Sequence, residues 1–105
     1  MNFSVLLSLY YKESPLFLDL ALESIWDKQR KKPNQIVLVL DGPISDDLQF
    51  TVDKWKKKLL EILQIVPLDK NVGLGNALNI GLKKCENDWV FRMDTDDICK
   101  PDRFE

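Results

Sequence analysis

Histidine is absent from this chain of 105 residues, and cysteine occurs only twice. Without an imidazole the chain cannot form a Ser-His-Asp triad or one of the usual zinc sites. Cys85 and Cys99 lack the spacing of metal ligands, and two thiols are too few for the disulfide framework of a small secreted protein. The cysteine content therefore predicts a reducing, cytoplasmic environment.

A surplus of basic residues is also missing, because the formal net charge is −2. A protein that binds nucleic acid needs a basic face to offset the phosphate charge, so nucleic acid is not expected as a partner. Two lysine-rich clusters, residues 28–32 and 54–58, are interpreted as solvated helix ends and faces. The alternative for these clusters is contact with a membrane surface.

Long apolar runs are lacking too, since no stretch approaches the roughly 20 residues that span a bilayer. The run of residues 5–9 has no basic segment before it and no small-residue cleavage site after it. We therefore interpret it as a first strand rather than a signal peptide. The length predicts one domain with a modest core, which is short for a whole enzyme.

Glycine is scarce, and the nucleotide-binding motifs built on it are incomplete. Gly73-Leu74-Gly75 does not complete Gly-x-Gly-x-x-Gly and follows the third predicted strand rather than the first. A Gly-Lys-Ser/Thr sequence is absent, which excludes a P-loop. These glycines instead predict a tight turn and close helix packing, with helix amides near a phosphate as a further option.

What the chain does contain is an alternation of strand-like and helix-like segments. This alternation predicts βαβ units around a parallel sheet, in the order β-α-β-α-β-α-β. The predicted strands are residues 4–10, 36–40, 62–67 and 89–93. The first helix is capped by Ser14 and ends near residues 28–32, and Asp46 or Asp47 caps the second. The apolar stripes of the three helices are Phe17, Leu20, Ala21, Ser24 and Ile25; Leu48, Val52, Trp55 and Leu59; and Leu74, Ala77, Leu78, Gly81 and Leu82.

An acidic cluster, Asp94-Thr95-Asp96-Asp97, directly follows the fourth predicted strand. A strand of a parallel sheet delivers such a cluster to the carboxyl edge, where open α/β folds bind ligands. Carboxylates this close repel one another unless a cation neutralises them, and oxygen ligands suit Mg²⁺ or Mn²⁺. The alternative is an Asp-rich turn that caps the next segment.

Two further polar signals are expected at the same edge, because right-handed crossovers bring the carboxyl ends of all the strands together. They are the segment of residues 8–13 and Asp41. Asp41 alone is equally consistent with a turn formed with Gly42, and Tyr10 and Tyr11 alone with core packing. Beside a metal site, these groups have a joint use: a ring stacks on a nucleobase and a carboxylate accepts its N–H.

The residues that carry a family resemblance follow in order along the chain: Ser4-Val5-Leu6-Leu7-Ser8 with Tyr10 and Glu13, residues 36–40 with Asp41-Gly42, Asn71-Val72-Gly73 with Ala77 and Asn79, and Asp94-Thr95-Asp96-Asp97 with Pro101-Asp102-Arg103. Together they resemble the N-terminal half of a family 2 glycosyltransferase with the GT-A fold. The resemblance is greatest to bacterial enzymes that build exopolysaccharide, capsule or lipopolysaccharide sugars. It implies a three-layer α/β/α, Rossmann-like domain with a mainly parallel sheet, truncated here, whose residues 1–105 are the donor-nucleotide-binding part.

The resemblance implies a nucleotide-sugar donor, with UDP favoured by its frequency in the family, and an Mg²⁺ or Mn²⁺ ion on its diphosphate. Asp96 matches the direct metal ligand, and Asp94 matches the acid near the ribose or the metal-bound water. Asp41 matches the acid that contacts the base. Ser8 and Tyr10 match positions that line the base pocket.

Glu13 matches an acid near the nucleotide, and Tyr11 stands where family members usually have asparagine. The general base of an inverting transfer, and most of the pocket for a saccharide or lipid-linked acceptor, are expected after Glu105. We therefore expect a fragment of a longer transferase, acting in the cytoplasm at the inner face of the membrane, whose uncovered sheet edge favours self-association.

Two other classes of protein remain open. A receiver-like domain combines an α/β sheet with clustered acids and Mg²⁺, but it needs an acidic pair after the first strand, where this chain has Tyr10-Tyr11-Lys12-Glu13. A non-catalytic interaction module would keep the strands and helices without the chemistry.

Overall fold

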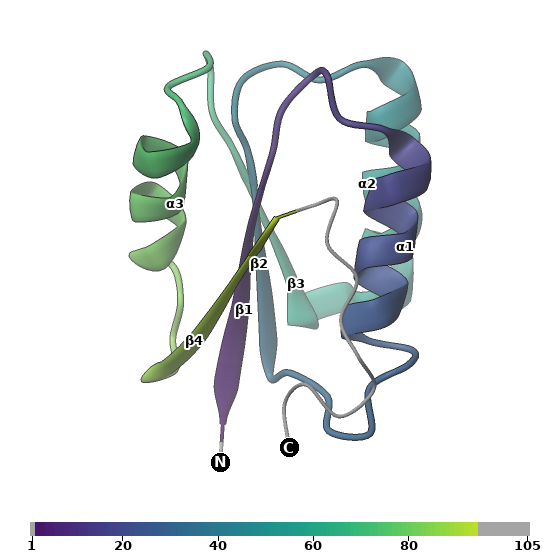
Figure 1. Ribbon diagram of the computed structural model, residues 1–105, viewed down its shortest axis with the longest axis vertical. Helices are drawn as coiled ribbons and strands as arrows, with labels where there is room; N and C mark the ends of the chain where they lie inside the picture. The colour runs from purple at the N-terminus through teal and green to yellow at the C-terminus, as the bar shows by residue number, and fades with distance from the viewer. Residues whose placement is uncertain (1, 95–105) are drawn as a thin grey trace.

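The computed structural model describes residues 2–94, including the backbone but not the side chain of Asp94. Its centre is a parallel sheet of four strands, β1 (Phe3–Leu9), β2 (Gln35–Leu40), β3 (Leu63–Pro67) and β4 (Trp89–Asp94). The bounds agree with the predicted strands to within one residue at each end. The spatial order is β3-β2-β1-β4, so the chain first builds outward from β1 and then returns to its other side (Figure 1).

Helices cover both faces of this sheet and make three layers. Helices α1 (Pro15–Ile25) and α2 (Asp46–Leu59) lie side by side on one face, and α3 (Leu74–Leu82) lies on the other (Figure 1). A short 3₁₀ turn, η1 (Leu60–Ile62), joins α2 to β3. The predicted three-layer α/β/α arrangement is confirmed. No helix in the described part of the chain is long and apolar enough to cross a membrane.

Alternation along the two central strands explains the layers. Four side chains of β1 face α1 and α2, while Leu6 packs with α3. In β2, Val37 and Val39 face α3, whereas Ile36, Leu38 and Leu40 face the other two helices. All seven residues of β1 and all six of β2 are buried, as expected for strands covered on both faces.

Two predicted helix boundaries are wrong. Helix α1 ends at Ile25 instead of near residues 28–32, because the Lys28 amide donates to the carbonyl of Glu23, five residues back, and so leaves the helical ladder. Helix α2 is capped by Ser45, whose Oγ accepts from the Leu48 amide at 3.2 Å. Asp46 and Asp47 lie in the first turn instead, where negative charge favours the helix dipole.

The predicted apolar stripes are only partly buried. Phe17 in α1 and Leu74 and Leu82 at the ends of α3 are exposed. Helical periodicity identifies residues that share a face, but it does not say how far the neighbouring layer extends. The buried residues of α3 are Ala77 and Gly81, in the middle of the helix over the central strands.

Close packing of α3 depends on Gly81. A Cβ atom at this position would lie 2.5 Å from Leu6 Cδ1 and 2.6 Å from Val39 Cγ2. The sequence suggests that Gly73 and Gly75 serve this purpose, and this is wrong for both, because nothing lies within 4 Å of the notional Cβ of either residue. Gly73 does form the predicted tight turn, with a φ of 90°.

A buried amide network secures the amino edge of the sheet. Gln35 Nε2 donates to Gln64 Oε1 at 2.9 Å and to the Lys84 carbonyl at 3.0 Å. Its Oε1 accepts from Ser4 Oγ at 2.8 Å and from the Glu86 amide at 2.9 Å. One side chain thereby ties β1, β2 and β3 to the connection between α3 and β4.

Candidate functional site

The site predicted from the sequence lies where the direction of chain winding reverses. Strands β1 and β4 are neighbours in the sheet, but the chain leaves β1 toward β2 and reaches β4 only after α3. In open α/β sheets, ligands bind outside the carboxyl ends of the strands at such a switch point. Ser8 near the end of β1 is the register partner of Asp94 at the end of β4. On the other side Ser8 pairs with Val39 of β2.

Asp41 follows β2 directly and is buried, with 3% of its surface exposed. Its amide donates to the Leu9 carbonyl at 2.7 Å, which ties it to the end of β1. The Gly42 amide donates to the Leu40 carbonyl at 2.9 Å, so Asp41 is the central residue of a three-residue turn. The predicted turn with Gly42 is therefore confirmed, and the turn places Asp41 at the carboxyl edge beside β1.

The Asp41 carboxylate also holds the connection between β3 and α3. Its Oδ1 accepts from the Val72 amide at 2.7 Å, and its carbonyl accepts from Asn71 Nδ2 at 3.2 Å. No donor within residues 2–94 reaches the other carboxylate oxygen, Oδ2. One oxygen of Asp41 is thus used for structure, whereas the other accepts no hydrogen bond from these residues. Its contact with a nucleobase stays a prediction.

Helix α3 begins at the same edge without a side-chain cap. Its N-cap residue is Gly73, so no side chain accepts from the amides of the first turn. Those amides form the positive end of the helix dipole. The suggested proximity of these amides to a phosphate remains a prediction.

The aromatic pair after β1 is exposed and does not belong to the core. Tyr10 and Tyr11 are 40% and 55% exposed, and their rings meet edge to face with centroids 6.0 Å apart. The interpretation as core packing is therefore wrong for both. The Glu13 amide donates to the Tyr10 carbonyl at 3.1 Å, which closes a turn and keeps residues 10–13 near the end of β1. An exposed ring here can stack on a flat ligand.

The acidic cluster can be placed only in part. Asp94 ends β4, so its backbone lies at the switch point, whereas Asp96 and Asp97 are outside the described residues. Among the side chains that the structure describes, residues 2–93, no three His, Cys, Asp or Glu side chains gather closely enough to hold a metal ion. The donor chemistry of Asp94 and Asp96 nevertheless fits a hard divalent cation, because carboxylate oxygens are the ligands that Mg²⁺ and Mn²⁺ prefer.

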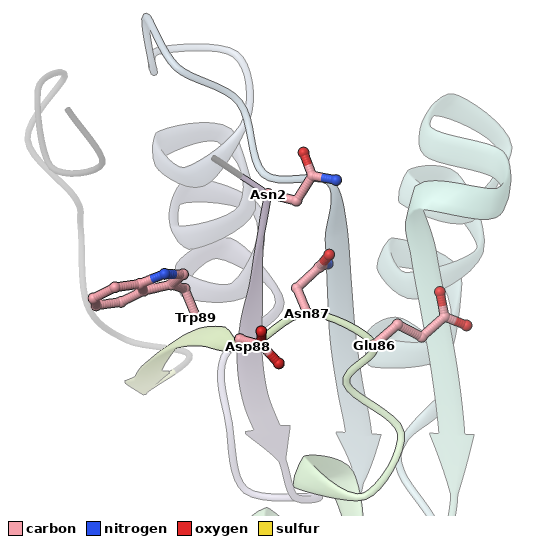
Figure 2. A pocket seen from close by; sticks show the side chains of 5 residues that line it. All are labelled: Asn2, Glu86, Asn87, Asp88 and Trp89. Carbon is pink, nitrogen blue, oxygen red and sulfur yellow. The ribbon is translucent and has the colours of Figure 1, made fainter.

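A hollow of about 360 Å³ lies at the opposite, amino edge of the sheet. Figure 2 shows its lining side chains, Asn2, Glu86, Asn87, Asp88 and Trp89. Asn87 already donates to Ser4 Oγ at 3.0 Å, as part of the buried network. None of the residues predicted to bind nucleotide lines this hollow.

The cluster of residues 54–58 forms part of the solvated surface of α2, as predicted, whereas residues 28–32 follow the end of α1 and form no helix. Lys54 Nζ lies 2.6 Å from Asp19 Oδ1, and Lys58 Nζ lies 2.5 Å from Asp27 Oδ1, so α2 is paired with α1 and the segment after it. The hydrogen bond from Lys54 lowers the pKa of Asp19 below its ordinary value, and the indole N–H of Trp55 acts in the same direction.

Asn71 was not singled out as a site residue by sequence reasoning. Its only signal was its place in the Asn71-Val72-Gly73 run. The structure shows that it bridges Asp41 and Gly73, since its Oδ1 also accepts from the Gly73 amide at 3.2 Å.

Comparisons with known proteins agree with this geometry. The family model described as "Glycosyl transferase family 2" matches residues 4–105. The amylovoran biosynthesis glycosyltransferase AmsE of Erwinia amylovora is 53% identical over 103 residues, which are 98% of this chain and 38% of that protein. An Escherichia coli protein, UDP-Gal:alpha-D-GlcNAc-diphosphoundecaprenol beta-1,3-galactosyltransferase, is 44% identical over 99% of this chain and 37% of its own length.

A solved structure shares the fold. S. aureus TarS 1–349 in complex with UDP superposes with a TM-score of 0.80 at 29% identity, over 97% of this chain and 29% of that chain. The predicted GT-A type of fold is thereby confirmed. The chain spans less than two fifths of the length of the two curated relatives.

Proposed function

The chain belongs to glycosyl transferase family 2, and from this we propose that residues 1–105 are the donor-nucleotide-binding part of a bacterial sugar transferase. The enzyme would move a sugar from a nucleotide-diphosphate donor to a saccharide or lipid-linked acceptor in surface polysaccharide synthesis. The observation that carries the proposal is the pairing of Ser8 with Asp94 at the switch point, with Asp41 at the same edge. Family membership also argues against the receiver-like alternative.

The nucleoside would lie between the ends of β1 and β2. Tyr10 offers an exposed ring for stacking on the base, and Asp41 Oδ2 accepts a base N–H. Ser8 lines the floor of this position, and Glu13 lies in the turn beside it. UDP is the proposed nucleotide, because the name of the E. coli relative specifies a UDP-Gal donor and the TarS structure contains UDP.

The diphosphate would lie at the ends of β1 and β4. Asp94 and Asp96 would hold Mg²⁺ or Mn²⁺ there, with Asp96 the direct ligand. Bound to the diphosphate, such a cation neutralises the charge that develops on the leaving group. The uncapped amides at the start of α3 add partial positive charge at the same edge.

The remainder of the catalytic apparatus is proposed to follow residue 105. An inverting transfer requires a general base that takes the proton of the acceptor hydroxyl while the anomeric centre is attacked. We propose that this base is a carboxylate and that it belongs to the part of the enzyme after residue 105. Location in the cytoplasm at the inner face of the membrane is part of the same proposal, since a donor nucleotide is a cytoplasmic metabolite and the E. coli relative uses a lipid-linked acceptor.

Isothermal titration with UDP tests the proposal directly. We expect heat of binding that increases when Mn²⁺ is present. Circular dichroism on the same sample establishes that the protein is folded. Absence of binding heat in a folded sample, with and without Mn²⁺, would contradict the assignment of a donor site and favour the non-catalytic module.

A further inference from the structure

Two loops at the carboxyl edge are held together by hydrogen bonds around Asp41. One loop follows β2 and contains Asp41 and Gly42, and the other is the connection between β3 and α3. The Leu68 amide donates to the Leu40 carbonyl at 2.9 Å, and Val72 donates to Asp41 Oδ1 at 2.7 Å. The second loop is therefore anchored to the end of β2 at both of its ends.

Asn71 also links the two loops, through both the nitrogen and the oxygen of its side-chain amide. Its Nδ2 donates to the Asp41 carbonyl at 3.2 Å, and its Oδ1 accepts from the Gly73 amide at 3.2 Å. A carboxamide offers a donor and an acceptor on one planar group, which aspartate, serine and alanine cannot do in the same way. The residue thus joins the Asp41 backbone to the N-cap of α3.

Gly42 allows the two loops to approach this closely. A Cβ atom at Gly42 would lie 2.7 Å from the Asn71 backbone nitrogen, and the φ of 92° is unfavourable for other residues. The contact is thus backbone against backbone, with no flexible side chain between. The Asp41 carboxylate itself is restrained by the hydrogen bond that Oδ1 accepts from the Val72 amide.

We infer that Asn71 is a positioning residue for recognition of the donor's base. This inference rests on the proposed function, because it assigns Asp41 Oδ2 to the base. Asn71 fixes the backbone carbonyl of Asp41, and the Val72 amide beside it holds Oδ1, so Oδ2 is directed to the ligand. Asn71 does not contact the reacting atoms, and it acts through Asp41.

Different residues would hold the base and the diphosphate of the donor. Loss of the Asn71 bridge loosens Asp41, which would hold the base, whereas Asp94 and Asp96 at the end of β4 would hold the metal and the diphosphate. A variant at Asn71 should therefore weaken binding of UDP much more than binding of ADP, whose base lacks the ring N–H of uracil. A purely structural role would weaken both nucleotides equally.

The experiment measures dissociation constants for UDP and ADP with Mn²⁺ in the wild type, Asn71→Ala and Asn71→Asp. Asn71→Asp keeps the acceptor for the Gly73 amide but replaces the donor to the Asp41 carbonyl by a carboxylate oxygen. Gln49→Ala is the matched control, because it removes an exposed carboxamide of α2 that bonds only Asp53 in the described residues. Thermal unfolding of each variant is recorded in parallel.

We expect roughly tenfold weaker UDP binding in both Asn71 variants, the effect of losing one well-placed contact, with ADP changed less than twofold and the control unchanged. Equal UDP affinity in wild type and variants, or an equal loss for both nucleotides, would overturn the inference. If Asn71→Ala is unfolded, Asn71→Asp decides by the same criteria. A wild type that binds no UDP would refute the proposed function instead, so the two failures are distinguishable.

Discussion

Ser8 and Asp94 are register partners at the carboxyl ends of β1 and β4, although they come from opposite ends of the described chain. The pairing exists because the chain winds from β1 through β2 and β3 and then returns to the free side of β1. That return creates the switch point at which α/β sheets bind ligands. The position of Asp94 next to Ser8 is thus a consequence of topology.

The metal assignment predicts the behaviour of Asp96→Asn. An amide oxygen carries no net charge and binds a hard cation more weakly than a carboxylate does, so Mn²⁺ should no longer improve UDP binding. We expect roughly a tenfold loss of UDP affinity with Mn²⁺ present and little change without it, measured by calorimetry. Asp53→Asn on α2 is the control. A full Mn²⁺ effect in Asp96→Asn would contradict the metal assignment.

Gly81→Ala should destabilise the protein by about 1–3 kcal/mol, because the added methyl group would overlap Leu6 and Val39 and force α3 away from the sheet. Urea unfolding measures the difference. Gly75→Ala is the matched control, since the same methyl group meets nothing within 4 Å there. Alanine in a helix is favoured over glycine, so we expect the control to be stabilised by up to about 1 kcal/mol. Equal effects would contradict the packing argument.

Gln35→Leu should cost about 1–3 kcal/mol of stability, although leucine is apolar and similar in size. The substitution leaves partly buried partners of the amide network, including the Lys84 carbonyl and the Glu86 amide, without their hydrogen bonds. Chemical denaturation gives the magnitude. Gln49→Leu on the exposed face of α2 should change stability by less than about 0.5 kcal/mol. If Gln35→Leu leaves the free energy of unfolding unchanged, the amide network contributes little to stability.

Asp19 should make stability depend on acid pH. Its folded pKa is lowered, chiefly by the Lys54 hydrogen bond, below an unfolded value of about 3.9. Its contribution is therefore fully present above about pH 4 and is lost as the pH falls through the folded pKa. The stability difference between wild type and Asp19→Asn should be constant near neutral pH and shrink in acid. Because the pair is partly exposed, the difference should be small, and parallel pH profiles would contradict it.

Self-association through the sheet edge remains a prediction. Strand β4 is an edge strand of the described sheet, and Trp89 at its start is 59% exposed. We expect sedimentation velocity to show an oligomer that grows with protein concentration and is reduced by Trp89→Lys. Phe50→Lys removes an aromatic residue of α2 that is even more exposed than Trp89, and it should leave the oligomer intact. A monomer at all concentrations would contradict the prediction.

Structural features that depend on residues close together in the sequence can be predicted from it. The strands follow from continuous apolar runs such as residues 36–40, and the layers follow from the alternation of these strands with helices. The end of α1 was missed because the periodic pattern says nothing about the Lys28 amide, which finds the Glu23 carbonyl. The cap of α2 was missed because serine and aspartate are both good capping residues, and only geometry distinguishes Ser45 from Asp46.

The candidate site likewise has features that the sequence predicts and features that only the structure shows. Ser8, Asp41 and Asp94 could be placed at one edge because each lies at or next to the carboxyl end of a strand, and parallel strands share that edge. The two uses of Asp41 could not be separated from the sequence, since its partners Val72 and Asn71 lie about 30 residues away. The close contact at Gly81 could likewise not be predicted from the sequence, because it is made with side chains of β1 and β2.

The central position of β1 has a consequence for the order of folding. Its contacts with β2 close a short stretch of chain, whereas its contacts with β4 join Phe3 to Trp89 across nearly the whole described sequence. The entropy of loop closure favours the nearer partner, so we expect β1 and β2 to associate early and β4 to dock last. The neighbourhood of Ser8 and Asp94 would then be assembled in the final step, and nucleotide binding would report on completed folding.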